Sequence, residues 1–243
     1  MEASEYRFMA QHQDRHWWFV GRRAVLAALL DGLDLPTGAR ILEIGCGTGG
    51  NLPLLARYGR VSGLEMDAYA RAFARDKTGV DVRDGRLPDA LPFDGERFDL
   101  VCLFDVLEHV ADDRAALAAI GALLAPGGRL LLTVPAHQWL WSVHDESLHH
   151  QRRYARGTLR NVLTDAGFAV QRLSFFNALL FVPAVAARLA DRWRGKTTAS
   201  GAALPAPPVN GLLTHLFAAE AAWLRRANLP FGLSLLALAR PAR

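Results

Sequence analysis

The residues best suited to chemistry in this 243-residue sequence form a glycine-rich turn after a short, mostly apolar run. Gly45, Gly47 and Gly50 give the spacing G-x-G-x-x-G directly after Ile41 to Ile44. Glycine permits positive φ angles and lets a ligand approach the backbone closely. Glu65 follows Gly45 by twenty residues, where an acidic side chain would hold ribose hydroxyl groups. The pattern predicts a nucleotide-type cofactor and by itself leaves nicotinamide enzymes in contention.

Glu43 sets this turn apart from a dinucleotide fingerprint. It places a carboxylate two residues before the first glycine, where dinucleotide-binding proteins normally keep an apolar residue. Gly49 also gives the spacing G-x-G-x-G. Both details favour the version of this loop that has an acidic residue near the end of the strand.

A second polar segment, Trp139 to Tyr154, contains three of the eight histidines, with two acids, two arginines and three aromatic residues. Histidine is the side chain most ready to take up a proton near neutral pH. We expect His150 to be the base or substrate anchor, with His149 and then His144 as the other catalytic candidates. Adjacent side chains point in different directions, so one of His149 and His150 should face the site. The alternative is that these histidines cap a helix or bond loop carbonyl groups.

Asp105, Glu108 and His109 form a third group of polar residues. On a helix, positions i, i+3 and i+4 share one face, and carboxylates with an imidazole there could hold a divalent metal. We expect a structural or cofactor-side role instead, and no metal.

The elements that must position these residues are short apolar runs alternating with helical patterns. Buried parallel strands have this composition, and their alternation with amphipathic stretches such as Asp113 to Leu124 predicts a doubly wound α/β sheet. Pro126 to Gly128 should form the turn before one strand. The expected strands are Arg40 to Gly45, Val61 to Glu65, Val80 to Arg83, Phe98 to Phe104 and Arg129 to Val134.

The remaining third of the chain is predicted to add two strands with a helical insertion between them. A helix before the insertion should cover Arg156 to Ala166. The insertion should form a cap over the site where the substrate binds. Its helices could instead pack on the sheet edge and enlarge the core. The expected parts are a strand at Phe168 to Phe176, a helix at Asn177 to Arg194, a linker at Gly195 to Val209, a helix at Leu212 to Arg226 and a strand at Leu233 to Ala239.

Composition excludes several classes of protein. A hydrophobic fraction of 51% and a charged fraction of 21% are typical of a globular domain and not of a disordered chain or a coiled-coil rod. Two cysteines and a polar N-terminus predict a cytoplasmic protein without a signal peptide. The net charge is +4, and the segment from Phe175 onward carries eight basic residues against two acidic ones. This apolar, basic segment indicates peripheral membrane contact or an acidic substrate, or else an ordinary solvated face; no nucleic acid is expected.

In their order along the chain, these motifs resemble the class I S-adenosylmethionine-dependent methyltransferases over residues 38 to 174. E-I-G-C-G-T-G, beginning at Glu43, matches the family's first motif, and Gly63 to Asp67 matches its ribose-binding strand end. The other matching segments are Asp84-Gly85, Leu91 to Phe93, Phe98 to Val101, Phe104 to Val110 and Leu123 to Gly128.

The resemblance implies a Rossmann-like sheet of seven strands in the order 3-2-1-4-5-7-6 with the last strand antiparallel. It also implies S-adenosyl-L-methionine as cofactor, S-adenosyl-L-homocysteine as product, and methyl transfer to a small-molecule, lipid-linked or sugar-linked acceptor, with oxygen the leading acceptor atom. The cofactor-binding residues expected on this basis are Glu43, Gly45, Cys46, Gly47, Thr48, Gly49, Glu65, Met66, Asp84, Gly85, Leu103 and Phe104.

Aromatic and basic residues outside the glycine turn are candidates for acceptor binding. The segment His16 to Arg23, which is expected to precede a helix at Ala24 to Leu33, combines bulky rings with two arginines. This composition suits a lid that stacks on a ligand and pairs with an anion, or a simple aromatic staple against the core. The acceptor is expected to be anionic or hydrophobic. The predicted substrate-binding residues are Trp18, Arg22, Arg23, Trp141, Arg152, Arg153 and Tyr154.

One domain is expected, divided into an N-terminal helical lid (1–37), a cofactor-binding core (38–176), the helical cap (177–231) and a final strand (232–243). Two other functions stay open at this point: a Rossmann-fold NAD(P)-dependent oxidoreductase, and a scaffold that binds a cofactor without catalysis.

Overall fold

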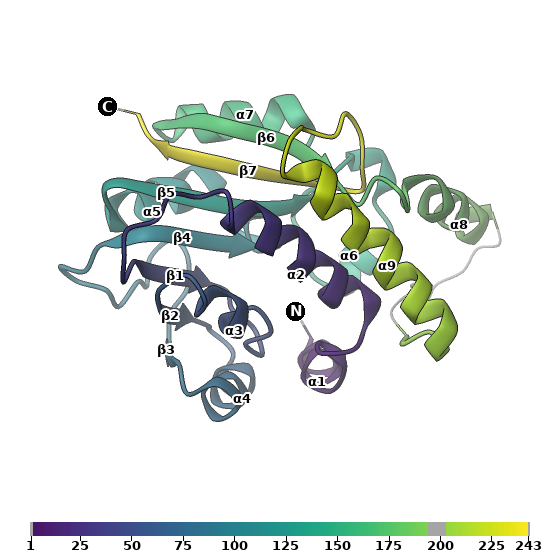
Figure 1. Ribbon diagram of the computed structural model, residues 1–243, viewed down its shortest axis with the longest axis horizontal. Helices are drawn as coiled ribbons and strands as arrows, with labels where there is room; N and C mark the ends of the chain where they lie inside the picture. The colour runs from purple at the N-terminus through teal and green to yellow at the C-terminus, as the bar shows by residue number, and fades with distance from the viewer. Residues whose placement is uncertain (1, 194–202, 243) are drawn as a thin grey trace.

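Within residues 2–193 and 203–242, which the computed structural model describes, seven strands form one mixed sheet (Figure 1). They are β1 (Arg40–Ile44), β2 (Arg60–Leu64), β3 (Asp81–Arg83), β4 (Phe98–Phe104), β5 (Leu124–Pro135), β6 (Phe168–Phe176) and β7 (Ser234–Pro241). Their order is β3-β2-β1-β4-β5-β7-β6. β1 to β5 run parallel, and β7 is antiparallel to both β5 and β6. The predicted order and the predicted antiparallel last strand are confirmed.

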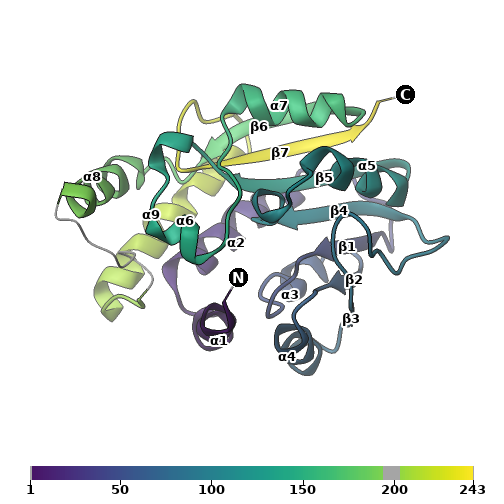
Figure 2. The same cartoon turned by 180° about the vertical axis from the view of Figure 1, so that it is seen from behind.

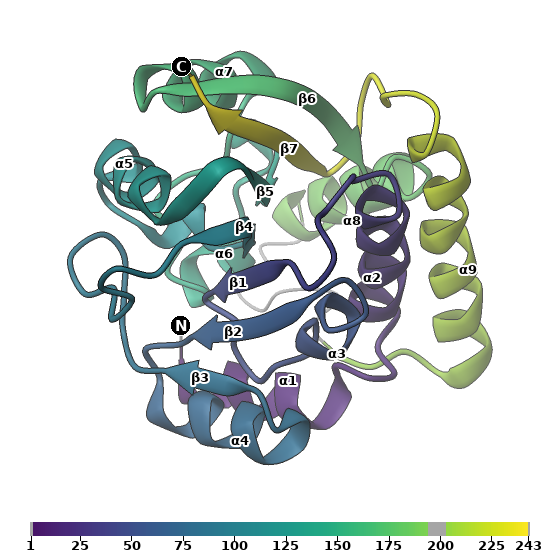
Figure 3. The ribbon, with the colours of Figure 1, turned by 60° about the vertical axis from the view of Figure 1, so that its left-hand side comes forward.

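Helices cover both faces of the sheet. Two separate apolar clusters lie against it, one formed with α5 and α7 and the other with α2, α3 and α9 (Figure 3). The helices of the described residues are α1 (Ala3–His12), α2 (Trp17–Leu30), α3 (Leu52–Leu55), α4 (Ala68–Thr78), α5 (Asp113–Leu123), α6 (Val143–Ser147), α7 (Arg156–Asp165), α8 (Phe181–Trp193) and α9 (Pro207–Leu224), with 3₁₀ turns η1 (Leu107–His109) and η2 (Gln138–Leu140).

β4 shows why the strand sequences are almost wholly apolar. Its side chains alternate between the two faces, so that Val101 and Leu103 enter the cluster under α5 and α7, whereas Leu100 and Cys102 enter the cluster under α2 and α9. All four are fully buried. A strand covered on both faces has no polar side, which is why a continuous apolar run and not an alternating one marks it in the sequence.

Side chains of the connecting loops fix where two of the helices begin. The carboxylate of Asp67 accepts a hydrogen bond from the Ala70 N–H at the start of α4, and Asp112 accepts one from Ala115 at the start of α5. Such caps pair backbone donors that the first helical turn leaves open. Asp67 comes soon after β2, whereas Asp112 follows β4 only after η1, so the two caps set how far the chain runs before it turns back over the sheet.

The structure corrects the sequence analysis at two element boundaries. α2 begins at Trp17, so the aromatic segment lies inside this helix and not before it. The predicted turn Pro126 to Gly128 lies within β5, whose pairing with β4 shifts register between Phe98 and Leu100. The proline and the glycines predict a turn at this place. β5 nevertheless continues through the irregularity, because it pairs with β4 both before and after it.

The insertion between β6 and β7 separates into two helices with different neighbours. α9 packs along α2, and its Phe217 is fully buried between them. α8 lies on the side of η2 and α6, where Arg188 donates a hydrogen bond to the carbonyl oxygen of Leu140 at 2.6 Å (Figure 2). Much of the predicted linker Gly195 to Val209 falls outside the described residues. Of the helices that the structure describes, none has the length and apolar character needed to cross a membrane.

The polar segments singled out in the sequence converge on one edge of the sheet. The glycine turn follows β1, Glu65 follows β2, η1 follows β4, and η2 with α6 follows β5. Because these strands are parallel, their carboxyl ends lie at the same edge, the usual place of ligand sites in open α/β sheets. The fold therefore brings together what the chain order keeps far apart.

Gly21→Ala should destabilise the protein by about 1–3 kcal/mol, the usual cost of overpacking a core. A Cβ atom at Gly21 would lie 2.6 Å from Cδ1 and 2.7 Å from Cβ of Phe217, so α2 and α9 would have to move apart. Gly211→Ala, within α9, is the matched control, because its added Cβ meets no atom within 4 Å and should stabilise by about 0.4–1 kcal/mol. Urea denaturation measures both; equal effects would contradict the close packing of the two helices.

Candidate active site

The glycine turn is held so tightly that positions 45 and 49 leave little room for a side chain. Gly45 and Gly49 have φ angles of 69° and 77°, in the left-handed region. A Cβ atom at Gly45 would lie 2.6 Å from Cγ2 of Val106, which follows β4. The Gly45 and Cys46 N–H groups both donate to the Leu64 carbonyl oxygen, at 2.8 and 3.1 Å. The turn is thereby fixed between the ends of β2 and β4, with its backbone open to a ligand.

Glu65 is fixed at the end of β2 by donors on three sides. Its carboxylate accepts hydrogen bonds from the N–H groups of Gly47 at 2.8 Å and Asp67 at 2.9 Å, and from the Tyr6 hydroxyl at 3.3 Å. Burial raises the pKa of Glu65, and these hydrogen bonds oppose the shift. The Tyr6 hydroxyl shows that this acid accepts hydrogen bonds from hydroxyl groups, which is what holding a ribose requires.

Glu43 is a buried acid, and one of its two carboxylate oxygens has no hydrogen-bond partner among the described residues. Oε1 accepts a hydrogen bond from Nδ2 of Asn51 at 2.8 Å, whereas Oε2 has no hydrogen-bond partner among the described residues. Burial raises its pKa to about 7, against the opposing effects of the Asn51 hydrogen bond and the Arg22 charge. An unpaired buried oxygen beside a glycine turn fits a ligand that brings its own N–H donors or a positive charge.

A pocket opens between the glycine turn and the N-terminal helices. Gln13, just after α1, fixes the turn through two hydrogen bonds with Thr48, one to its carbonyl oxygen at 3.1 Å and one from its hydroxyl at 2.8 Å. Residues from α1, α2, the turn and β4 form the lining, namely Met9, Gln13, Phe19, Arg22, Arg23, Gly45, Cys46, Gly50, Asn51 and Phe104. Five predicted site residues, Arg22, Arg23, Gly45, Cys46 and Phe104, are among them.

The other predicted cofactor residues lie at varied depths around this edge. Met66 is exposed after β2, at 62% of its full surface, where its side chain is free to cover a flat ring. Asp84 is also exposed and pairs with Arg71 at 2.9 Å. The side chain of Leu103 lies in the apolar cluster under α5 and α7, so any cofactor contact from this position comes from its backbone.

Asp105 does not share a helix face with Glu108 and His109, which corrects the sequence analysis. Its φ angle is 59°, and η1 begins only at Leu107. The Asp105 carboxylate forms an ion pair with Arg22 and accepts a hydrogen bond from the Thr133 hydroxyl at 3.1 Å. The predicted i, i+3, i+4 arrangement fails because the chain leaves β4 in a left-handed turn and not in a helix.

Asp145 organises the histidine-rich segment. This fully buried carboxylate accepts hydrogen bonds from Nδ1 of His150 at 2.9 Å, from Nε of Arg153 at 2.7 Å and from Nη2 of Arg153 at 2.9 Å. The Ser142 N–H donates to it as well, at 2.9 Å. Although burial opposes ionisation, the hydrogen bonds from His150 and Arg153 lower the pKa of Asp145. His150 is therefore held in one orientation by a permanently charged partner.

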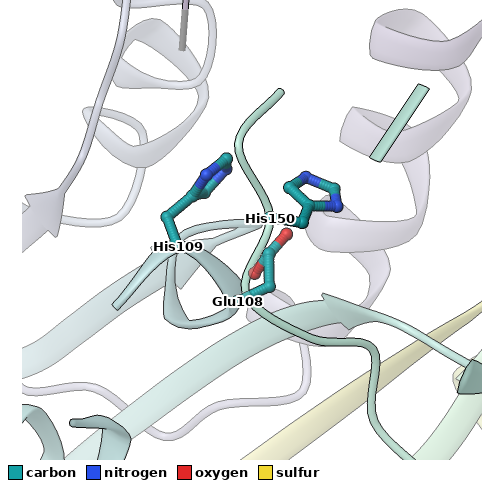
Figure 4. A group of neighbouring side chains, drawn as sticks. All are labelled: Glu108, His109 and His150. Atoms are coloured by element: carbon teal, nitrogen blue, oxygen red, sulfur yellow. The ribbon is translucent and has the colours of Figure 1, made fainter. Parts of the chain in front are cut away.

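His150 faces Glu108 and His109 (Figure 4). The two imidazole centroids are 4.7 Å apart, and the Gln151 N–H donates to the Glu108 carbonyl oxygen at 2.7 Å, which ties this segment to η1. Glu108 is fully buried, and neither carboxylate oxygen has a hydrogen-bond partner among the described residues. Burial and the nearby Asp105 charge raise the pKa of Glu108 far above its usual range, while burial lowers that of His109 to about 4.

The remaining predicted residues of this segment occupy different surroundings. His149 is exposed and has a φ angle of 58°. Burial lowers the pKa of His144 to about 4. Asp113 accepts hydrogen bonds or ion pairs from Arg152 at 2.9 Å and from the Tyr154 hydroxyl at 2.8 Å. The roles predicted for these residues toward an acceptor stay predictions.

The aromatic residues predicted to bind substrate take part in internal packing. Trp18 packs against Phe217, with ring centroids 5.3 Å apart, and the Arg22 guanidinium lies 6.0 Å from the Trp18 ring centroid. Trp18 therefore links α2 to α9. Trp141 lies half-buried just after η2. Whether either ring contacts an acceptor stays a prediction.

Sequence reasoning missed four residues that shape the site: Tyr6, Gln13, Asn51 and Asp145. The first three reach the glycine turn or its acids through tertiary contacts, and no local pattern signals such contacts. Asp145 did leave a signal, because it lies five residues before His150 within the segment already singled out. Its role depends on Arg153, which donates hydrogen bonds to the same carboxylate.

Sequence comparison places residues 11–173 in a family described as a methyltransferase domain. A protein of Mycolicibacterium smegmatis, described as an S-adenosylmethionine-dependent methyltransferase, is 31% identical over 162 residues, 65% of this chain and 62% of that protein. The ubiquinone biosynthesis O-methyltransferase of Xanthomonas axonopodis is 35% identical over 104 residues, 40% of this chain and 44% of the enzyme. The chain thus matches less than two thirds of the length of these curated relatives.

Solved structures share the fold. A methyltransferase of Haloferax volcanii, solved in complex with the Trm112 methyltransferase activator, has a TM-score of 0.65 and 21% identity, covering 99% of this chain and 95% of its own. The geranyl diphosphate C-methyltransferase of Streptomyces coelicolor, solved with S-adenosyl-L-homocysteine, has a TM-score of 0.59 and 16% identity, covering 89% of this chain and 78% of its own. Of the two enzyme classes that the glycine spacing left open, the family match supports the methyltransferase.

In the wild-type protein the free energy of unfolding should fall as the pH rises, and Glu43→Gln should make this fall smaller. Because burial raises the pKa of Glu43 to about 7, the folded protein keeps this proton after the unfolded chain has lost it, so the free energy of unfolding falls between about pH 4.5 and about pH 7. We expect up to about 3 kcal/mol of that fall to be absent in the glutamine variant. Urea denaturation at several pH values measures it. The same fall in both proteins would contradict the assignment.

Proposed function

The chain belongs to the class I S-adenosylmethionine-dependent methyltransferases, and on that premise we propose that it transfers the methyl group to an oxygen of a small-molecule, lipid-linked or sugar-linked acceptor. The observation that carries the proposal is the Asp145–His150 hydrogen bond at the carboxyl edge of the sheet. An oxygen acceptor usually has to lose a proton during methyl transfer, and a histidine oriented by a carboxylate is suited to taking it. The similarity to ubiquinone biosynthesis O-methyltransferases supports oxygen as the acceptor atom.

The glycine turn and its two acids are the proposed cofactor site. Glu65 would accept hydrogen bonds from ribose hydroxyl groups in the way that it accepts one from Tyr6. The open oxygen of Glu43 and the pocket beside Arg22 and Arg23 would receive the amino and carboxylate groups of the methionine part. When bound, S-adenosylmethionine supplies a methyl group that is already electrophilic, so alignment is the main task left to the protein.

His150 is the proposed base. Because Nδ1 is hydrogen-bonded to Asp145, Nε2 is the nitrogen left to accept a proton from the acceptor hydroxyl. The positive charge that then forms on the imidazole is stabilised by the buried Asp145 carboxylate. Arg153 keeps that carboxylate ionised and in place, and thus supports the base without contact with the acceptor.

The acceptor is proposed to enter past α8 and to be hydrophobic or membrane-resident, with an anionic group. Val182, Leu189 and Trp193 expose 70%, 52% and 92% of their surfaces along one side of this helix, a large apolar area for a surface helix. Such a stripe supports peripheral contact between a cytoplasmic protein and a membrane. α1 and α2 would then act as the lid over the cofactor, and α8 as the cap over the acceptor.

S-adenosyl-L-homocysteine should stabilise the fold, by about 2.7 kcal/mol at a hundredfold excess over its Kd. Glu65→Ala should weaken its binding by about 1–3 kcal/mol, because the ribose loses its acceptor oxygens. Asp165→Ala, which removes an exposed carboxylate from the end of α7, is the control and should bind normally. Calorimetric titration checks the affinities. Unchanged affinity in Glu65→Ala would exclude the ribose contact.

His150→Ala should lower turnover by about 10²–10⁴-fold while leaving cofactor affinity intact, since a general base contributes that much. The measurement is release of S-adenosyl-L-homocysteine with a panel of hydroxylated small molecules and lipid-linked acceptors. His149→Ala is the matched control, because this neighbouring imidazole is exposed, whereas His150 is bonded to the buried Asp145. Turnover near wild type in His150→Ala would refute the base, and cofactor binding without turnover on any acceptor would favour the scaffold.

A further inference from the structure

We propose that a second cavity, between the ends of α2 and α9 and strands β5 and β7, binds a small amphipathic anion of the medium-chain carboxylate class. The volume of this cavity is about 200 Å³, and it shares no lining residue with the pocket beside the glycine turn. The inference goes beyond the proposed function, because neither the cofactor nor the acceptor takes part in it.

The two halves of α2 line different sites. Arg22 and Arg23 face the pocket beside the glycine turn, whereas Ala28 and Leu29 face the second cavity. Arg23 and Ala28 are separated by about 7.5 Å along the helix axis, at a rise of 1.5 Å per residue. Figure 1 shows α9 side by side with α2 over the same face of the sheet, and the two helices pack closely. The second cavity therefore lies under the far end of this helix pair.

The inner wall of the cavity is apolar. Ala28 and Leu29 from α2, Leu131 from β5 and Leu236 from β7 line it, and all four side chains are buried. Protein interiors are normally packed to the density of organic crystals, so a void among leucine side chains loses packing contacts and costs stability. Apolar voids hold water poorly and accept apolar ligands instead. The wall therefore suits the hydrocarbon part of a ligand.

The size of the cavity limits the length of that hydrocarbon part. An apolar cavity of about 150 Å³ is large enough for benzene, so one of about 200 Å³ has room for a single alkyl chain of about six to eight carbons. The two chains of a diacyl lipid are too large for it. A single-chain ligand would leave its polar end at the mouth of the cavity.

Arg172 brings a positive charge to this mouth without a counter-ion. Its Nε donates a hydrogen bond to Oδ1 of Asn228 at 2.9 Å, and its Nη2 donates to the carbonyl oxygens of Leu224 and Ala227. All three acceptors are uncharged, and Nη1 has no partner among the described residues. Burial lowers the pKa of Arg172, and no nearby carboxylate opposes the shift. A half-buried guanidinium with a free nitrogen is suited to binding a carboxylate.

Arg225 adds a second positive charge on the outer side of the mouth. Its Nη2 lies 3.4 Å from Oδ2 of Asp31, in an exposed pair that contributes little. The other oxygen of Asp31 accepts a hydrogen bond from the Tyr58 hydroxyl at 2.7 Å. Asp31 itself is not part of the lining, which contains two guanidinium groups and no acid. The charge at the mouth is therefore complementary to a ligand with one negative charge.

Calorimetric titration of the intact chain with octanoate, in parallel with octanol, tests both parts of the proposal. We expect one octanoate molecule per chain and weaker binding of octanol, which has the same chain without the charge. Arg172→Gln should weaken octanoate binding by about 10–100-fold, because hydrogen bonds to a charged group contribute that much. The same variant should leave octanol binding unchanged.

Gly32→Phe tests the position of the ligand. Gly32 lines the cavity, and a Cβ atom added there would have only the Leu29 carbonyl oxygen within 4 Å, at 3.4 Å. The phenyl ring should therefore obstruct the cavity without disturbing the core, and binding of both octanoate and octanol should be lost. Gly157→Phe on α7 is the matched control, because it adds the same ring where a Cβ atom meets nothing within 4 Å. It should bind both compounds as wild type does.

Three results would overturn the proposal. They are no saturable octanoate binding, equal affinity for octanoate and octanol, and wild-type octanoate affinity in Gly32→Phe, which would place the ligand elsewhere, for example at the acceptor site. Circular dichroism checks that the variants are folded. If Gly32→Phe does not fold, Arg172→Gln still decides, since unchanged octanoate affinity in that variant also rejects the site.

Discussion

Buried carboxylates at the carboxyl edge of the sheet are the constraint on which the rest of this structure depends. Glu43, Glu65, Glu108 and Asp145 follow or end four different parallel strands, and each is almost wholly removed from water. A buried charge is tolerable only with hydrogen-bond donors or a counter-charge nearby. The glycine turn, the ordered N-terminal segment and the Arg153 side chain are all placed where these acids need donors.

The four acids divide by how completely the protein satisfies them. Glu65 and Asp145 have donors on several sides, and the pKa of Asp145 is lowered as a result. Glu43 keeps one open oxygen and Glu108 two, and burial raises the pKa of both. An incompletely satisfied polar group in a native fold calls for a physical explanation, and a ligand is the simplest one at a strand edge. Glu65 and Asp145, whose oxygens have hydrogen-bond donors, hold neighbouring groups in place. Glu43 and Glu108, which have oxygens without donors, are where we expect ligands to bind.

The sequence predicted the sheet well because its strands obey a local rule. Runs such as Phe98 to Phe104 are apolar since both faces are covered, and the order of motifs sets the topology. The glycine turn also obeys a local rule. Its positive φ angles require glycine at fixed positions, so the spacing of the glycines predicts it. Contacts between distant segments were not predictable in this way: the left-handed Asp105 breaks the expected helix face, and the approach of His150 to Glu108 depends on a loop forty residues later.

The insertion between β6 and β7 is bonded to the N-terminal segment, and this joins it to the glycine turn. Asn210, at the start of α9, accepts a hydrogen bond from the Trp17 N–H at 2.9 Å and donates one to the Arg15 carbonyl oxygen at 2.8 Å. These bonds fix the segment that leads back through Gln13 to the glycine turn. Packing of Phe217 against Gly21 holds the same two helices together. An insertion that looks peripheral in the sequence therefore packs on α2, the same helix that lines the pocket beside the glycine turn.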